Sequence, residues 1–270
     1  MTNQYGIPAM GFGTYGRTGE AGIAAMLVAL ETGYRHLDTA QDYGTETEVG
    51  ETVKLSSLKR SEVFVTTKIK TGNFGKGMLV PSLRQSCDNL QVDQLDLTLI
   101  HWPSPNEEIA LEVYIEQLAE AHALGLTRLV GVSNFTIALI EQAKTVLGEV
   151  PIANNQFELN PLLQNRKLAN YCLSNGISVT CYLPIARGVL GGEPVVRAIA
   201  DKHGATPEQV ALAFEFAKGY IAIPTSGKAE RIRSNFEATK LRLSAEDIVA
   251  IEGVDRGQRE INPGWGPAWD

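Results

Sequence analysis

Short apolar runs alternate with longer segments of helical character along the chain. The middle runs are apolar at most positions, as in Leu95–Ile100. Strands that are covered on both faces have this composition, and such strands are usually parallel. The pattern predicts eight strands, at Met10–Gly13, Arg35–Asp38, Val63–Lys68, Leu95–His101, Leu129–Ser133, Ala153–Glu158, Ser178–Tyr182 and Ile221–Pro224.

The segments between these runs are rich in helix-forming residues and have recognisable ends. Thr206-Pro207 is a strong helix start, because threonine caps a helix and proline is tolerated at its first position. Ser244, with Asp247 three residues later, marks another start. The predicted helices are Ala21–Thr32, Asn106–Leu124, Ile137–Leu147, Asn165–Ser174, Glu193–His203, a helix from Thr206, Ala229–Thr239 and a helix capped by Ser244.

The number and spacing of the strands indicate the fold class. Strand starts recur about every 30 residues, which is the size of one βα unit. No Pro/Ser-rich linker divides the chain. Eight such units favour an α/β fold of the closed (β/α)8 TIM-barrel type over an open doubly wound sheet. We therefore predict one domain over residues 1–270, with a short C-terminal tail at 254–270 near the barrel mouth.

Composition and charge exclude several classes of function. The net charge is −7, which argues against binding to a nucleic-acid backbone. The longest apolar run, Ala24–Leu30, is far shorter than the roughly 20 residues of a membrane helix, and no secretory signal pattern is visible. Cys87, Cys172 and Cys181 form no C-x-x-C pair, so we expect no disulfide framework and no metal site. These features predict a cytoplasmic protein that binds neither membrane nor nucleic acid.

The segment Gly11–Gly16 matches G-x-G-x-x-G, the fingerprint of dinucleotide-binding Rossmann domains. Its context is poor, because only a short strand precedes it. We interpret the segment instead as a tight turn after the first barrel strand, where small residues let a ligand approach the backbone.

Polar residues follow most of the predicted strands. In a (β/α)8 barrel the active site is built at the carboxyl ends of the strands, so these positions are candidates for function. In strand order they are Thr14 and Tyr15, Asp38 and Tyr43, Lys68, His101 and Trp102, Ser133 and Asn134, Gln156 and Glu158, Tyr182, and Thr225 with Ser226.

Asp38, Tyr43, Lys68 and His101 make chemical sense as a group. A lysine at the end of a buried strand needs a partner, because an isolated buried ammonium is too costly, and Asp38 is on the neighbouring strand. A tyrosine near this lysine would have its pKa lowered from about 10 and could act as a general acid. His101 could orient a carbonyl group. The alternative is a structural Asp38–Lys68 ion pair, but four such residues on successive strands favour proton delivery to a carbonyl oxygen.

A series of motifs in this order resembles the aldo-keto reductase family over nearly the whole chain. The resemblance implies that Tyr43 is the general acid, that Lys68 and Asp38 tune it, and that His101 orients the substrate carbonyl. The motifs are Gly11-Phe12-Gly13-Thr14-Tyr15, Gly33-Tyr34-Arg35-His36-Leu37-Asp38-Thr39-Ala40, Tyr43-Gly44, Thr66-Thr67-Lys68, Leu99-Ile100-His101-Trp102-Pro103 and Gly131-Val132-Ser133-Asn134-Phe135.

The resemblance also implies an NADPH/NADP⁺ cofactor bound across the barrel mouth without a Rossmann domain. Thr225 stands where the family usually has a lysine, and Ser234 where it usually has a glutamate. We expect Lys228 to supply the missing charge to the 2′-phosphate, so that NADPH is preferred over NADH. The residues implied to bind the cofactor are Gly13, Thr14, Tyr15, Ser133, Asn134 and Gln156 (the carboxamide), Tyr182 (stacked on the nicotinamide), Ser226, Lys228, Arg231 and Asn235.

Within the family, the chain is most similar to bacterial enzymes that reduce 2,5-diketo-D-gluconate, methylglyoxal and other small carbonyl compounds. We expect Tyr15, Trp102 and Trp265 to contact the substrate. For Trp265 and Trp269, packing of the tail onto the barrel is an equal alternative. The resemblance implies a monomer. A rival function is a regulatory module that binds the nicotinamide cofactor as a sensor and turns over little substrate.

Overall fold

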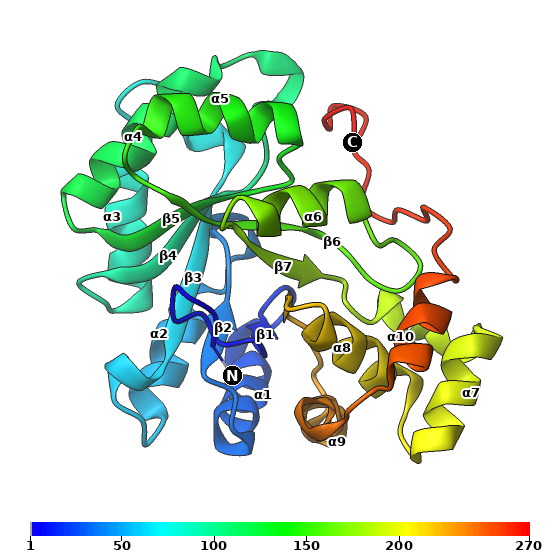
Figure 1. The fold of residues 1–270 in the computed structure, drawn as a ribbon. Coiled ribbons are helices and arrows are strands. Elements are labelled where there is room, and N and C mark those ends of the chain that lie inside the picture. The colour runs from blue at the N-terminus through cyan, green and yellow to red at the C-terminus, as the bar shows by residue number, and fades with distance from the viewer. Residues whose placement is uncertain (1) are drawn as a thin grey trace.

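The computed structural model describes residues 2–270 and contains eight parallel strands, hydrogen-bonded in the order in which they occur in the sequence (Figure 1). Hydrogen bonds also join the first strand to the last, because Gly11 N–H donates to the Ala222 carbonyl at 2.9 Å and Gly13 N–H to the Pro224 carbonyl at 3.1 Å. The two edges of the sheet therefore meet. The strands are β1 Phe12–Gly13, β2 His36–Asp38, β3 Phe64–Ile69, β4 Leu95–Ile100, β5 Thr127–Ser133, β6 Ile152–Glu158, β7 Ser178–Tyr182 and β8 Ile221–Ala222.

Helices cover the outer face of the curled sheet (Figure 1). Two predicted starts are confirmed, because Thr206 and Ser244 form capping boxes with Gln209 and Asp247. The α-helices are α1 Gly19–Thr32, α2 Glu46–Leu55, α3 Leu79–Leu90, α4 Leu111–Ala123, α5 Ile137–Leu147, α6 Arg166–Ser174, α7 Pro194–His203, α8 Pro207–Ala217, α9 Ala229–Glu237 and α10 Ala245–Glu252. None of the helices described within residues 2–270 is both long and apolar enough to span a membrane.

The predicted start of one helix at Asn106 is wrong, since α4 begins at Leu111. Asn106 and Glu107 have positive φ angles of 50° and 56°, which a helix does not accept. The Ser104 hydroxyl instead accepts a hydrogen bond from Ile109 N–H at 2.9 Å and closes a turn before the helix. The acidic residues after Asn106 therefore belong to the loop that follows β4.

The sequence pattern did not predict α2 and α3. Gly50 lies in the middle of α2 and weakens its helical signal. A β-carbon at Gly50 would lie 2.8 Å from the Asn89 carbonyl oxygen, so glycine is needed where α2 crosses the end of α3. Pro81 stands in the first turn of α3, where proline is tolerated. In the sequence alone, however, this proline indicates a break in a helix.

The strand register places the carboxyl ends of neighbouring strands side by side. Gly13 pairs with Asp38 across β1 and β2, and Ser133 pairs with Gln156 across β5 and β6. All six residues of β3 are buried, including Lys68. The polar residues that end the strands are therefore brought together on one rim of the sheet.

Candidate active site

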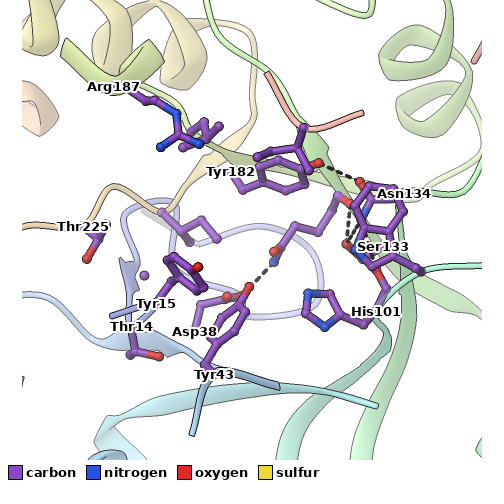
Figure 2. A pocket seen from close by; sticks show the side chains of 16 residues that line it. Thr14, Tyr15, Asp38, Tyr43, His101, Ser133, Asn134, Tyr182, Arg187 and Thr225 are labelled. Carbon is purple, nitrogen blue, oxygen red and sulfur yellow. Dashed lines mark hydrogen bonds between the residues drawn. The ribbon is translucent and has the colours of Figure 1, made fainter. Parts of the chain in front are cut away.

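A cavity of about 410 Å³ opens at the carboxyl ends of the strands. Figure 2 shows side chains from opposite sides of the sheet pointing into it, with Thr225 across the cavity from Asn134. Residues from the ends of β1, β2, β4, β5, β6 and β7 contribute to its wall. Of the residues singled out from the sequence, those that line it are Gly13, Thr14, Tyr15, Asp38, Tyr43, His101, Trp102, Ser133, Asn134, Gln156, Tyr182 and Thr225.

Lys68 is fully buried beneath this cavity, and its ammonium has three oxygen partners. Nζ donates to the Asp38 carboxylate, to the Thr39 carbonyl at 2.8 Å and to the Tyr43 hydroxyl at 3.5 Å. The second carboxylate oxygen of Asp38 accepts a hydrogen bond from Gln156 Nε2 at 2.7 Å. Burial works against the charge on Lys68, but Asp38 and Tyr43 together raise its pKa above the ordinary value. The lysine is therefore a charged group fixed under the tyrosine hydroxyl.

The Tyr43 hydroxyl is held at the cavity floor, and its pKa is raised rather than lowered. Burial raises the pKa above 10, and this effect exceeds the opposite effect of the Lys68 charge. The prediction from sequence that the nearby lysine lowers the pKa of Tyr43 is therefore wrong in net direction, because that argument left out the loss of water around the phenol. At neutral pH the hydroxyl carries its proton.

His101 lies beside Tyr43, with the two ring centroids 5.5 Å apart. Burial lowers the pKa of His101, although Asp42, with a carboxylate oxygen 3.4 Å from Nδ1, acts in the opposite direction. The ring is therefore neutral at pH 7 and has one N–H to donate.

A row of hydroxyl and amide groups forms the cavity wall beside His101. The Ser133 hydroxyl donates to the Gln156 carbonyl at 2.8 Å, and Asn134 Nδ2 donates to the Ser133 oxygen at 3.1 Å. The Tyr182 hydroxyl donates to Asn134 Oδ1 at 2.8 Å, which fixes its ring along the cavity (Figure 2). Side-chain amides next to an aromatic face are complementary to a planar ring that carries a carboxamide, so these residues fit a nicotinamide.

Trp265, expected in the substrate pocket, does not line the cavity. Its ring packs edge-on against Trp102 with the centroids 5.3 Å apart, and it is 39% exposed. The Trp269 ring also lies against Trp102, and the Arg259 guanidinium stacks over Trp269 at 3.5 Å. The arrangement corresponds to the alternative in which these tryptophans pack the tail onto the barrel.

The residues expected to bind the adenosine phosphate lie just beyond the cavity, after β8. The Ser226 hydroxyl accepts a hydrogen bond from Lys228 N–H at 3.1 Å. Lys228 and Arg231 are exposed at the start of α9, and Asn235 is buried on the same helix. Thr225, which directly precedes Ser226, lines the cavity, so these residues begin at the cavity edge.

Four cavity residues escaped the sequence analysis. Leu183 and Ile223 each lie one or two positions from a residue that the strand-end argument singled out. Arg187, which has a positive φ of 52°, and Ile261 come from loops distant in sequence, and no local pattern marks them. Glu158 does not line the cavity, but its carboxylate accepts hydrogen bonds from the backbone N–H groups of Glu260 at 2.9 Å and Ile261 at 2.8 Å.

The described part of the chain, residues 2–270, contains no group of three or more His, Cys, Asp and Glu side chains placed to hold a metal ion. Cys87, Cys172 and Cys181 are buried free thiols, and burial raises the pKa of Cys87 to about 11 and that of Cys172 to about 12.

Comparison with known proteins agrees with this geometry. The model of the Aldo/keto reductase family matches residues 9–256. The chain is 46% identical to methylglyoxal reductase DkgB of Yersinia pestis, over 98% of this chain and 99% of the relative. It is 38% identical to 2,5-diketo-D-gluconic acid reductase B of Corynebacterium sp., over 92% and 89%.

The fold is also similar to that of a solved relative. The structure of aldose reductase from Schistosoma japonicum superposes with a TM-score of 0.89 at 31% identity, covering 95% of this chain and 91% of that one. Three findings point to the same family: the eight parallel strands with outer helices, the sequence similarity over almost the full length, and the matching family model. The chain therefore belongs to the aldo/keto reductase family, whose members are oxidoreductases.

Proposed function

We propose that the protein reduces small aldehydes and ketones with NADPH, and that Tyr43 protonates the carbonyl oxygen. The observation that carries this proposal is the buried Lys68 ammonium, which contacts both Asp38 and the Tyr43 hydroxyl at the floor of the cavity. We place this activity in one domain of residues 1–270, with the tail at 254–270 beside the barrel mouth.

The donor groups of the cavity wall fit the cofactor. Ser133, Asn134 and Gln156 would hold the carboxamide, and the Tyr182 ring would lie against the nicotinamide. When bound, NADPH supplies the hydride to the carbonyl carbon. Gly13, Thr14 and Tyr15 line the same cavity and would flank the cofactor.

The protein supplies the proton and stabilises the charge that its transfer leaves behind. The Tyr43 hydroxyl gives its proton to the carbonyl oxygen and becomes a phenolate next to the Lys68 ammonium, whose charge favours that form. The neutral His101 ring donates its N–H to the same carbonyl oxygen and orients it. Asp38 keeps Lys68 charged and in place, so the site is preorganised before the reaction.

For the substrate, we propose methylglyoxal and 2,5-diketo-D-gluconate, the compounds named for the two relatives. The cavity of about 410 Å³ is of the size that accepts small ligands. Trp102 lines it and would contact the substrate. We favour the enzyme over a sensor module because the complete set of Asp38, Tyr43, Lys68 and His101 is assembled for proton transfer. We also propose that it acts as a cytoplasmic monomer.

The replacement Tyr43→Phe tests the function. It removes the proton donor and keeps the ring, so the rate of NADPH-dependent methylglyoxal reduction should fall by about 10²–10⁴-fold. NADPH affinity, measured by quenching of tryptophan fluorescence, should change less than about threefold. Tyr5→Phe is the matched control, because the Tyr5 hydroxyl donates its hydrogen bond to the Gly176 carbonyl at 2.9 Å and Tyr5 does not line the cavity.

Two results would contradict the proposal. Substantial activity in Tyr43→Phe would exclude Tyr43 as the acid. If the unmodified protein binds NADPH but turns over no compound in a broad panel of carbonyl substrates, the sensor interpretation would replace the enzyme.

A further inference from the structure

An arginine that follows the first strand reaches a glycine that follows the last strand. Arg17 lies in the loop between β1 and α1, and Gly227 lies in the loop between β8 and α9. A β-carbon on Gly227 would be only 2.5 Å from Arg17 Nη1. The guanidinium therefore occupies the space that any other residue at position 227 would fill. Figure 1 shows α1 and α9, which follow these loops, side by side at the edge where the sheet closes.

The Arg17 guanidinium has no partner within residues 2–270. It makes no side-chain hydrogen bond or ion pair there, and its Nε is buried without an acceptor. Lys228 follows Gly227 directly and Arg231 lies one turn into α9, and neither forms an ion pair with any described residue. The Arg17 guanidinium therefore lies against the segment that carries Lys228 and Arg231, and none of the three cations is ion-paired within the described residues, although Glu230 stands between the last two. Cations that lack ion-pair partners beside a cavity are suited to binding an anion.

This group of cations adjoins the cavity of the active site. Thr225 and Thr14 both line the cavity. Arg17 is tied to that wall because its backbone N–H donates to the Thr14 carbonyl at 2.8 Å. Figure 2 shows Thr225 across the cavity from Asn134 and His101. Arg17 follows Thr14 by three residues and Lys228 follows Thr225 by three, so both belong to the loops on the Thr225 side.

We propose that Arg17 is a specificity-determining residue that binds a phosphomonoester, the 2′-phosphate of NADPH, together with Lys228 and Arg231. This inference rests on the proposed function. The planar guanidinium can give two parallel hydrogen bonds to phosphate oxygens, which a lysine cannot. Arg17 approaches from the loop after β1. It supplies a positive charge, whereas Thr225 at the edge of the cavity is neutral.

The test compares two ligands that differ by one phosphate. Adenosine 2′,5′-bisphosphate and 5′-AMP are titrated into the full-length protein by calorimetry. Arg17→Gln should weaken binding of the bisphosphate by about 10–100-fold, the range for loss of hydrogen bonds to a charged group, and change binding of 5′-AMP less than about twofold. Gly227→Ala should give a smaller loss, because its methyl group displaces the guanidinium.

Three further variants complete the design. Arg231→Ala is the positive comparison, and it should lose bisphosphate affinity selectively. Arg233→Gln removes an exposed charge from the same helix and should leave both affinities within about twofold. Arg17→Lys keeps the charge and should retain part of the preference, and circular dichroism establishes that each variant is folded.

The outcomes separate this inference from the proposed function. If Arg17→Gln keeps the full preference for the bisphosphate, or loses both ligands equally, Arg17 does not recognise the 2′-phosphate. If inorganic phosphate binds through Arg17 while the two nucleotides bind equally, the site takes free phosphate and the assignment is overturned. If the unmodified protein binds neither the bisphosphate nor NADPH, the proposed cofactor fails as well.

Discussion

Lys68 and Glu215 are both fully buried, and their surroundings are opposite. Lys68 ends β3 beneath the cavity and contacts Asp38, Thr39 and Tyr43. Glu215 lies on α8 in the packed layer outside the sheet, near Cys181, and neither of its carboxylate oxygens has a hydrogen-bond partner within the described chain. Equal burial is therefore combined with partners for the charge in one case and with none in the other.

The difference follows from the cost of burying a charge. A buried ion is tolerated when partners replace the water it loses, and otherwise it gives up its charge. Lys68 has such partners, and its pKa is raised. Burial raises the pKa of Glu215 well above its ordinary value, so burial favours the protonated, uncharged form of this group. Burial alone does not mark a functional group, whereas a buried charge with partners beside a cavity does.

The largest effect is expected from removing the Lys68 charge from its ion pair with Asp38. Lys68→Met leaves the Asp38 carboxylate buried without its cation, which should destabilise the protein by about 3–5 kcal/mol and reduce carbonyl reduction by at least about 10²-fold. Urea denaturation and steady-state rates measure the two effects.

The double variant Asp38→Asn/Lys68→Met separates these two effects. It removes both charges and should recover much of the stability without recovering activity, because the neutral pair needs no counter-ion. If Lys68→Met unfolds no more readily than the unmodified protein, the pair is not the buried ion pair described above.

This comparison also shows how far the sequence could lead. The pairing of Lys68 with a counter-charge was predictable. Lys68 ends an apolar strand and a buried ammonium needs a partner, and the neighbouring strand ends in Asp38. The environment of Glu215 was not predictable, since one acid among the apolar residues of α8 is compatible with an exposed helix face. Its burial depends on how α8 packs, which is a tertiary property.

The same limit applies to the fold and to the cavity. The ends of the strands could be predicted because a covered parallel strand is a run of apolar residues in the sequence. The polar residues directly after each run are then candidates for the rim of the cavity. Arg187 and Ile261 could not be predicted, because loops and a tail bring them to the cavity from a distance in sequence. The contact of Arg17 with Gly227 depends likewise on closure of the sheet.

Glu158 is an intermediate case, and a smaller effect is expected from it. Its buried carboxylate forms no ion pair with any residue in 2–270, but it accepts hydrogen bonds from Glu260 N–H and Ile261 N–H. Glu158→Gln replaces one accepting oxygen with an NH₂ group that faces a donor, which should cost about 1.5–3 kcal/mol and release the tail. Limited proteolysis should then cut the tail faster, and KM should rise because Ile261 lines the cavity. An unchanged cleavage rate would show that Glu158 does not hold the tail.

Replacing the unpartnered acid should give the smallest change near pH 5, and the change should grow as the pH rises. The unfolded chain loses the Glu215 proton near pH 4.3, whereas the folded protein keeps it to higher pH. Above that pH the unfolded state binds fewer protons, so the contribution of Glu215 lowers stability by up to about 1.4 kcal/mol per pH unit. Glu215→Gln removes this contribution, and its stability advantage, measured by urea denaturation, should grow from pH 5 to pH 8. Glu116→Gln, an exposed change on α4, should show no such trend. A constant difference between Glu215→Gln and the unmodified protein across this range would mean that Glu215 is ionised in the folded state, and the contrast with Lys68 would fail.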